Sequence, residues 1–321
     1  MRRVLLAVII VFSAFSMLTQ LVSAAAFPTK QVEVIVPWSA GGATDVLFRA
    51  IANVFPKHAN GQPMVIKNIP GGGAVTGTME FVKSKPDGYT GLGIATPIIT
   101  KMNMSKVPFN MDSFEPVIMV VENPCMIMVR ADSKFKNLRD FIEAARKNPG
   151  AIGIGNGGAG GGTHIVALAF EDFAGVEFLH VPYQGGGPAI IALLGGHIDS
   201  VMASAPEGIS NAEAGQLRIL GVLGPKRLAR FPDVPTAAEQ GFDFSLSMWR
   251  GICVPKGTPK ATVKALHDIL LKCIEDPEFK RQGDELAIEI VYKGPEDFGE
   301  YMRAEDKFYN RLIKVKGLED K

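Results

Sequence analysis

The chain has 321 residues, 47% of them hydrophobic and 21% charged, and its formal net charge is +1. This balance argues against nucleic acid and against a polybasic membrane contact, and the length suits two domains. Cys125, Cys253 and Cys273 match no zinc motif, and the five histidines are scattered singly. We therefore expect buried thiols, and neither a metal nor a cofactor.

The N-terminal 26 residues predict a signal peptide. Arg2 and Arg3 form a basic start, an apolar stretch spans 4–18, and small residues surround Ala26. An uncleaved membrane anchor is the alternative, which the short apolar stretch disfavours. We expect cleavage near Ala26, which leaves an exported chain that begins near Phe27 and has a net charge of −1, because two arginines are lost.

Short apolar runs alternate with helical segments along the rest of the chain, which is typical of an α/β fold with parallel strands. We expect strands at 34–36, 64–66, 90–95, 152–154, 178–181, 198–203 and 217–222. We expect helices at 46–55, 75–84, 138–147, 165–173, 188–194, 259–274, 277–286 and 295–315. Thr44 or Asp45 is the expected N-cap of the first of these helices.

Two longer apolar segments, 117–129 and 244–254, depart from this alternation. We interpret them as two crossings between α/β lobes that lie side by side as a hinge, the first of them broken at Asn123-Pro124. Lobe 1 would then be discontinuous, with 27–124 plus 248–321, and lobe 2 would span 125–247. Cys125 and Cys253 would lie on neighbouring crossings, so a disulfide between them is a hypothesis.

Four glycine-rich turns each follow an apolar run and precede a helix, at 37–45, 70–73, 157–164 and 184–188. Glycine permits a tight turn and a close approach to ligand, and the helix N-terminus behind each turn offers free N–H groups to an anion. Open α/β sheets bind ligands at the carboxyl ends of their strands. Because these turns contain almost no charged side chains, the pattern favours a small anion held by backbone in one cleft.

A dinucleotide site is a formal alternative, because Gly155, Gly157 and Gly160 have the spacing of a dinucleotide fingerprint after a strand. The acid that should follow at the end of the next strand is missing, since that strand ends in Pro182-Tyr183. No phosphate-binding loop with lysine occurs elsewhere in the chain. The sequence therefore disfavours a nucleotide.

An exported hydrolase or isomerase is the alternative function. His164 would act as the base with Asp45 or Asp199, and the candidate nucleophiles are Ser39, Thr163 and Ser204. No Gly-x-Ser-x-Gly elbow supports a nucleophile. Capping or loop-fixing roles outweigh catalysis for His164 and Asp45, so we expect no catalytic residue.

Aromatic and basic residues near the turns and crossings allow two interpretations each. Trp38 and Tyr183 stand beside the glycines, where they could face a ligand or pack in the core. Trp249 lies in the second crossing, where core and cleft are equally expected. Arg130 and Arg250 could pair with a ligand carboxylate, but a salt bridge between lobes is the favoured interpretation.

An ordered set of motifs carries a family resemblance over nearly all of the mature chain. The motifs are Pro37-Trp38-Ser39-Ala40-Gly41-Gly42-Ala43-Thr44-Asp45, Pro70-Gly71-Gly72-Gly73, Pro86-Asp87-Gly88-Tyr89-Thr90, Val181-Pro182-Tyr183-Gln184-Gly185-Gly186-Gly187-Pro188-Ala189, Leu193-Leu194-Gly195-Gly196 and Phe231-Pro232-Asp233-Val234-Pro235-Thr236. The chain resembles the Bug or TctC family of periplasmic solute receptors. The resemblance implies a two-lobed periplasmic-binding-protein fold of the Venus-flytrap type (type II), with a doubly wound mixed sheet in each lobe. It also implies a periplasmic protein, expected to be a monomer, that delivers a small carboxylate to the membrane permease of a tripartite tricarboxylate transporter.

The resemblance also implies where the carboxylate is held, mostly by main-chain amides. It points to Ser39, Ala40, Gly41, Gly42, Asp45, Gly160, Gly161, His164, Tyr183 and Gly186. Trp38, Thr163 and Ser204 complete the predicted ligand-binding set, from their places beside these turns.

One feature departs from the family pattern, which usually has serine or threonine among the glycines of the third turn. Here Gly160, Gly161 and Gly162 run together and only Thr163 keeps a hydroxyl. We hypothesise that this turn admits a bulkier or less polar acid. A ligand sensor for a membrane signalling partner stays open beside transport, because both would use the same cleft.

Overall fold

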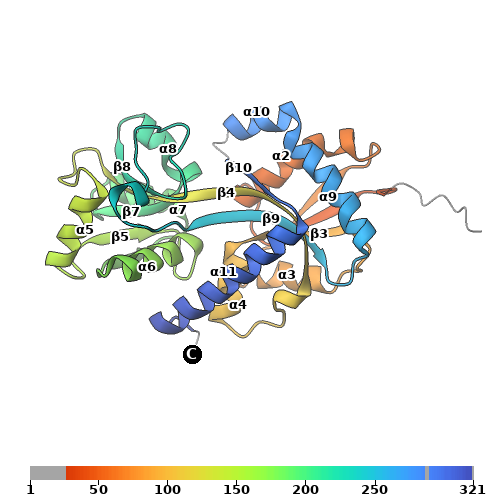
Figure 1. The fold of residues 1–321 in the computed structure, drawn as a ribbon, viewed down its shortest axis with the longest axis horizontal. Coiled ribbons are helices and arrows are strands. Elements are labelled where there is room, and N and C mark those ends of the chain that lie inside the picture. Colours follow the sequence, from red (N-terminus) through yellow and green to blue (C-terminus); the bar gives the residue numbers. More distant parts are fainter. Residues whose placement is uncertain (1–26, 286–288, 320–321) are drawn as a thin grey trace, which may run out of the picture.

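Figure 1 shows the protein as a two-lobed α/β structure in which two long strands join the lobes. The computed structural model describes residues 27–285 and 289–319. The predicted signal peptide lies outside the described residues. No helix of the described part is long and apolar enough to cross a membrane.

Lobe 1 is built on a mixed sheet that the chain enters first. Strand β1 (Val32–Val36) pairs in parallel with β2 (Met64–Asn68) and β3 (Thr90–Ala95), and β3 pairs antiparallel with β9 (Ser247–Pro255). The first half of β4 (Phe114–Arg130) continues the sheet beside β9, with β10 (Ile290–Lys293) on its other side. The helices of this lobe are α2 (Ala43–His58), α3 (Val75–Val82), α4 (Thr96–Met104), α9 (Lys260–Glu275), α10 (Pro277–Glu285) and α11 (Pro295–Lys316), with a short 3-10 turn, η1, at Met111–Ser113.

Lobe 2 repeats the scheme on a second mixed sheet. Strand β5 (Gly153–Asn156) pairs in parallel with β6 (Leu179–Pro182) and β7 (Ser200–Ser204). The second half of β4 pairs antiparallel with β7 and with β8 (Leu217–Leu223). The helices are α5 (Leu138–Lys147), α6 (Gly162–Ala174), α7 (Gly186–Leu194) and α8 (Ala205–Glu213), with a 3-10 turn, η2, at Ala238–Gln240.

The two predicted crossings are confirmed as β4 and β9. They pair antiparallel from Phe114 opposite Pro255 to Pro124 opposite Ser247, and β4 then pairs with lobe 2 strands from Cys125 onward. The break predicted at Asn123-Pro124 is wrong, because the strand continues through both residues. Proline is tolerated there since it stands at the end of the β9 ladder, where β4 changes its pairing partners.

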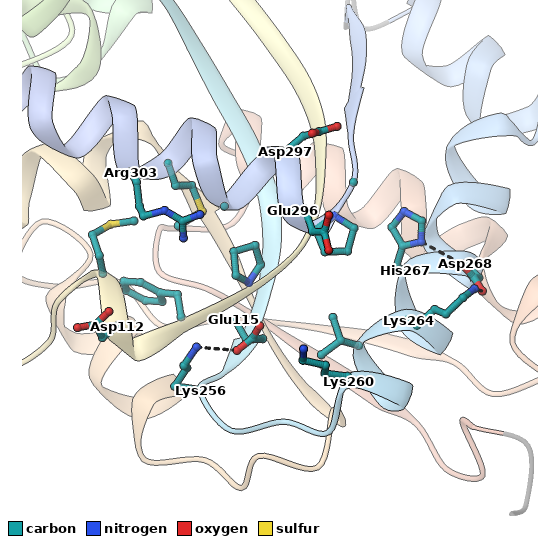
Figure 2. A pocket seen from close by; sticks show the side chains of 18 residues that line it. Asp112, Glu115, Lys256, Lys260, Lys264, His267, Asp268, Glu296, Asp297 and Arg303 are labelled. Atoms are coloured by element: carbon teal, nitrogen blue, oxygen red, sulfur yellow. Dashed lines mark hydrogen bonds and ion pairs between the residues drawn. The ribbon is translucent and has the colours of Figure 1, made fainter.

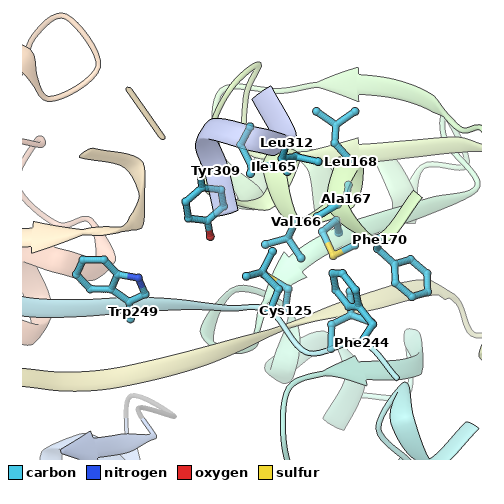
Figure 3. Packing of buried hydrophobic residues seen from close by; sticks show 14 of the residues in the cluster. Cys125, Ile165, Val166, Ala167, Leu168, Phe170, Phe244, Trp249, Tyr309 and Leu312 are labelled. Carbon is cyan, nitrogen blue, oxygen red and sulfur yellow. The ribbon is translucent and has the colours of Figure 1, made fainter. Parts of the chain in front are cut away.

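A buried cluster at the crossings joins both lobes to α11. Figure 3 shows side chains of α6 and α11 meeting over the crossing strands, at Ile165, Val166, Tyr309, Leu312, Trp249 and Cys125. The sequence left Trp249 either in the core or in the cleft, and the structure places it in the core, fully buried. Near its C-terminus, α11 contacts lobe 2 through Lys316, whose Nζ lies 3.3 Å from Glu171 Oε1 and 3.4 Å from Asp172 Oδ1.

The disulfide hypothesis is wrong. Cys125 and Cys253 are both free and buried. Cys253 stands opposite Pro116 near one end of the β4–β9 ladder, whereas Cys125 stands beyond its other end, opposite Ser204 and Leu223. Neighbouring crossings therefore do not bring the two sulfur atoms together.

Candidate functional site

The first glycine-rich turn is held in shape by Asp45. This carboxylate is buried, and its Oδ2 accepts hydrogen bonds from the Gly41 amide (2.8 Å) and from Arg49 Nε (2.9 Å). Its Oδ1 accepts a third from Asn68 Nδ2 (3.0 Å). Burial by itself raises the pKa of Asp45, but these bonds outweigh it and hold the pKa below its ordinary value. The ionised Asp45 carboxylate therefore holds the first turn in its conformation through these hydrogen bonds.

The helix behind this turn begins without a side-chain cap. Helix α2 starts at Ala43, and Gly42 is the N-cap, so the prediction that Thr44 or Asp45 caps the helix is wrong. Asp45 bonds to Gly41, one residue before the cap, because it already stands in the first helical turn. The amides of Ala43 and Thr44 have no acceptor among the described residues. They remain available to an anion, as the glycine pattern predicted.

Replacing Asp45 is expected to loosen this turn. Asp45→Ala removes three hydrogen bonds and leaves the Gly41 amide without a partner, so we expect a loss of about 2 kcal/mol or more in the free energy of unfolding. Chemical denaturation measures it. The control is Asp132→Ala, whose carboxylate pairs with Arg130 on an exposed surface and should contribute less than about 1 kcal/mol. Equal effects of the two substitutions would contradict the role given to Asp45.

The third and fourth turns lie against each other in lobe 2. A methyl group on Gly157 would come 3.4 Å from the Gly186 amide nitrogen, and one on Gly158 would come 3.3 Å from the Tyr183 carbonyl oxygen. Thr163 Oγ1 accepts from the Gly157 amide (2.8 Å), which tightens the third turn onto the start of α6. These predicted site residues therefore form one cluster at the carboxyl ends of β5 and β6.

His164 is neutral and engaged within its own turn. Its Nδ1 accepts a hydrogen bond from the Gly160 amide (2.9 Å), and its ring meets that of His180 edge-on at 5.1 Å. Burial, helped by the neighbouring His180, lowers the pKa of His164 to about 4. Asp45 serves the first turn, and Asp199 accepts from the Gly153 amide at 2.8 Å. Among the described residues neither acid pairs with His164, so the hydrolase alternative gains no support here.

A cavity of about 200 Å³ lies where the two lobes and the two crossings meet. Its walls come from the first turn and α2, from both crossing strands, and from the start of α8 in lobe 2. The residues are Gly41, Ala43, Val46, Leu47, Val121, Asn123, Pro206 and Arg250. Of the predicted ligand-binding residues, Gly41 is in this wall, while the third and fourth turns lie outside it.

Arg250 is the cation of this cavity. Its residue is 7% exposed, and its Nε donates to Thr44 Oγ1 at 3.1 Å. Among the described residues its terminal nitrogens have no hydrogen-bond acceptor and no carboxylate within 4 Å. The interlobe salt bridge favoured for Arg250 is therefore wrong, and so is that for Arg130, which pairs with Asp132 two residues along the chain.

No ligand contact was expected from the sequence for two lining residues, Asn123 and Pro206. Asn123 seemed a strand breaker, although an amide inside an apolar run is itself unusual. Pro206 belongs to α8, which was not predicted, as α4 was not. The signal for α8 is Ser204-x-x-Glu207 with Pro206 between, because Glu207 Oε2 accepts from both the amide and the hydroxyl of Ser204 at 2.8 Å.

A larger cavity of about 660 Å³ lies on lobe 1, away from the predicted turns (Figure 2). It opens between α9, α11 and the start of β4, and several of its charged groups face one another. Lys256 Nζ lies 3.0 Å from Glu115 Oε2, and Lys264 Nζ lies 2.5 Å from Asp268 Oδ2. Lobe closure would not enclose a ligand there, since a single lobe supplies all of its walls. The interlobe cavity is the better candidate site.

Comparison with known proteins gives the family. The model of the tripartite tricarboxylate transporter family receptors, TctC, matches residues 47–318. The chain belongs to the TctC family. BugT of Bordetella pertussis is 34% identical over 265 residues, which cover 81% of this chain and 81% of BugT.

Solved TctC-family structures share the fold. A TctC solute-binding protein from Polaromonas is 35% identical with a TM-score of 0.81, over 90% of this chain and 99% of that one. A protein of R. palustris solved with adipate is 27% identical with a TM-score of 0.78, over 91% of this chain and 98% of that one. The predicted family and the two-lobed α/β fold are confirmed. As a TctC-family member, the chain is a solute-binding receptor of the periplasmic type.

Proposed function

We propose that this receptor binds a small carboxylate between its lobes and delivers it to the permease of a tripartite transporter. The observation that carries the proposal is the interlobe cavity, where the unbonded Ala43 amide at the start of α2 and the terminal nitrogens of Arg250 provide donors for an anion. The adipate complex of the R. palustris relative supports a carboxylate as ligand. The signal peptide predicted for residues 1–26 would bring the chain to the periplasm, where we expect a monomer.

The two lobes would close on the ligand because each lobe supplies part of the site. We divide the chain into lobe 1 (27–124 plus 248–321) and lobe 2 (125–247), since β4 changes partners between Pro124 and Cys125. An anion that contacts α2 and the start of α8 at once gains both sets of contacts only when the lobes approach. It therefore shifts the equilibrium towards the closed form.

The predicted binding residues have two roles in this proposal. Those of the first turn, Trp38, Ser39, Ala40, Gly41, Gly42 and Asp45, would shape and supply the lobe 1 side. Those of lobe 2, Gly160, Gly161, Thr163, His164, Tyr183, Gly186 and Ser204, would form the lobe 2 side of the cleft beyond the cavity itself. Backbone amides of the turns already donate hydrogen bonds to the side chains of Asp45, Thr163 and His164. These three residues would therefore act by holding the turns in place.

A thermal-shift screen tests this function. The chain from Phe27 onward is titrated with mono-, di- and tricarboxylates and aromatic acids, among them hexanoate, adipate and citrate. A bound acid at about 100 times its Kd should stabilise the fold by roughly 2.7 kcal/mol, and the acid should be recovered unchanged. The absence of a shift with every acid would contradict a carboxylate receptor, and conversion of an acid would support the hydrolase.

A further inference from the structure

Two side chains of the interlobe cavity, those of Arg250 and Asn123, have polar atoms without partners among the described residues. Arg250 on β9 stands opposite Val121 on β4, and Asn123 lies two residues further along β4. Asn123 is 2% exposed, and its Oδ1 is sealed without a hydrogen bond. Its Nδ2 donates to no acceptor among the described residues either. Buried polar groups without partners are costly. The guanidinium and Asn123 Nδ2 are donors beside one cavity, so they point to a ligand that accepts hydrogen bonds, whereas the sealed Oδ1 is itself an acceptor that a carboxylate does not complete.

Apart from the backbone at Gly41 and Ala43, with its unbonded Ala43 amide, the rest of the cavity wall is apolar. Val46 and Leu47 come from α2, Val121 from β4, and Pro206 from α8 of the other lobe. No acidic side chain lines the cavity, and Arg250 is its one cation among the described lining residues. A single charged head with a hydrocarbon body matches these walls, whereas a second charge would be placed against them without a counter-ion.

Lobe 2 carries a negative charge at Glu207, the residue of α8 that follows Pro206 of the cavity wall. Glu207 is exposed, and its carboxylate packs so closely on the fourth turn that a methyl on Gly186 would come 2.4 Å from it. Ser204 donates two hydrogen bonds that hold this carboxylate at the start of α8. A second ligand carboxylate directed towards lobe 2 would meet this charge. Repulsion of that kind is a common source of specificity.

We infer that the solute of this receptor is a monocarboxylate with an apolar body. Arg250 and Asn123 hold its carboxylate, its body lies on Val46, Leu47, Val121 and Pro206, and Glu207 rejects acids with a second carboxylate. This inference rests on the proposed function and makes it narrower. It also separates this receptor from its relative that was solved with the dicarboxylate adipate.

Hexanoate and adipate are matched probes, because they share a six-carbon chain and differ by the second carboxylate. Calorimetric titration of the mature wild-type protein should give a Kd for hexanoate at least tenfold below that for adipate. Arg250→Gln should weaken hexanoate binding roughly 10–100-fold, the usual effect of losing a charged hydrogen-bond pair. Arg250→Lys keeps the charge and should retain part of the affinity. Glu207→Gln should leave hexanoate binding in place and reduce the preference over adipate at least fivefold.

Controls separate this inference from the function on which it rests. Arg130→Gln removes an exposed arginine paired with Asp132 and should not change either affinity. Melting curves without ligand show whether the Arg250 variants are folded, and Glu207→Gln tests the selectivity independently of them. If wild-type protein binds adipate as tightly as hexanoate, or only shorter or more polar acids, the inference fails and the carboxylate receptor stands. If no acid of the panel binds, both fail.

Discussion

Gly251→Ala is expected to destabilise the protein by about 3 kcal/mol or more. Gly251 lies in β9, between β3 and β4, at the centre of the crossings. A methyl group there would come 2.5 Å from the Ile118 carbonyl oxygen of β4 and 2.6 Å from the Phe298 ring of α11. The ring could turn aside, but the carbonyl oxygen belongs to the β4–β9 ladder, so the strands would have to separate. The loss of stability from overpacking is usually about 1–3 kcal/mol, and it is largest where the backbone must move.

Denaturant titration measures this loss, and Gly187→Ala is the matched control. Gly187 lies in α7, and a methyl group there meets no atom within 4 Å. Alanine should therefore stabilise that helix by roughly 0.5–1 kcal/mol. A Gly251→Ala protein within about 1 kcal/mol of wild type would mean that the crossing strands are looser than the structure shows.

Glu305→Gln is expected to stabilise the protein above neutral pH and to have little effect in acid. Glu305 of α11 is 8% exposed and accepts a hydrogen bond from Trp249 Nε1 at 3.2 Å. Burial raises the pKa of Glu305 from 4.5 to about 7, although the Trp249 bond opposes the shift. The folded state therefore keeps a proton that the unfolded state has already released. The contribution of Glu305 to the free energy of unfolding is fully present below pH 4.5 and is lost as the pH rises through about 7.

The size of this effect follows from the shift. A difference of about 2.5 pKa units corresponds to roughly 3 kcal/mol at pH 8, as an upper limit. Glutamine keeps an acceptor for Trp249 and has no proton to lose, so the variant should melt several degrees above wild type at pH 8 and close to it at pH 4.5. Melting curves at both values test this, with exposed Glu300→Gln as control. A difference that does not change with pH would contradict a buried, titrating Glu305.

Much of the architecture was readable from the sequence because local patterns decide it. The alternation of strands and helices and the two long apolar runs predicted two joined lobes, and of the two crossings β4 pairs with strands of both lobes. The continuity of β4 through Asn123-Pro124 was not readable, because tertiary pairing overrides the local preference of proline there. Likewise, the register that separates Cys125 from Cys253 depends on where the β4–β9 ladder begins, which no local pattern encodes.

The candidate site was readable only in part. The glycine turns predicted free amides, and α2 indeed begins with unbonded amides at Ala43 and Thr44. Arg250 was assigned to a salt bridge because surface arginines usually find carboxylates. Its burial between Thr44 and an open cavity arises from the packing of β9 against α2, residues about 200 positions apart. Whether the predicted lobe 2 residues contact the solute stays a prediction.

Small-angle X-ray scattering tests the central claim, that a carboxylate bound between the lobes closes them. The mature protein is measured alone and with a saturating concentration of the acid that gives the largest thermal shift. We expect a smaller radius of gyration in the presence of the acid, because both lobes must approach to contact it. A clear thermal shift with an unchanged radius of gyration would contradict it, and would place the acid outside the cleft.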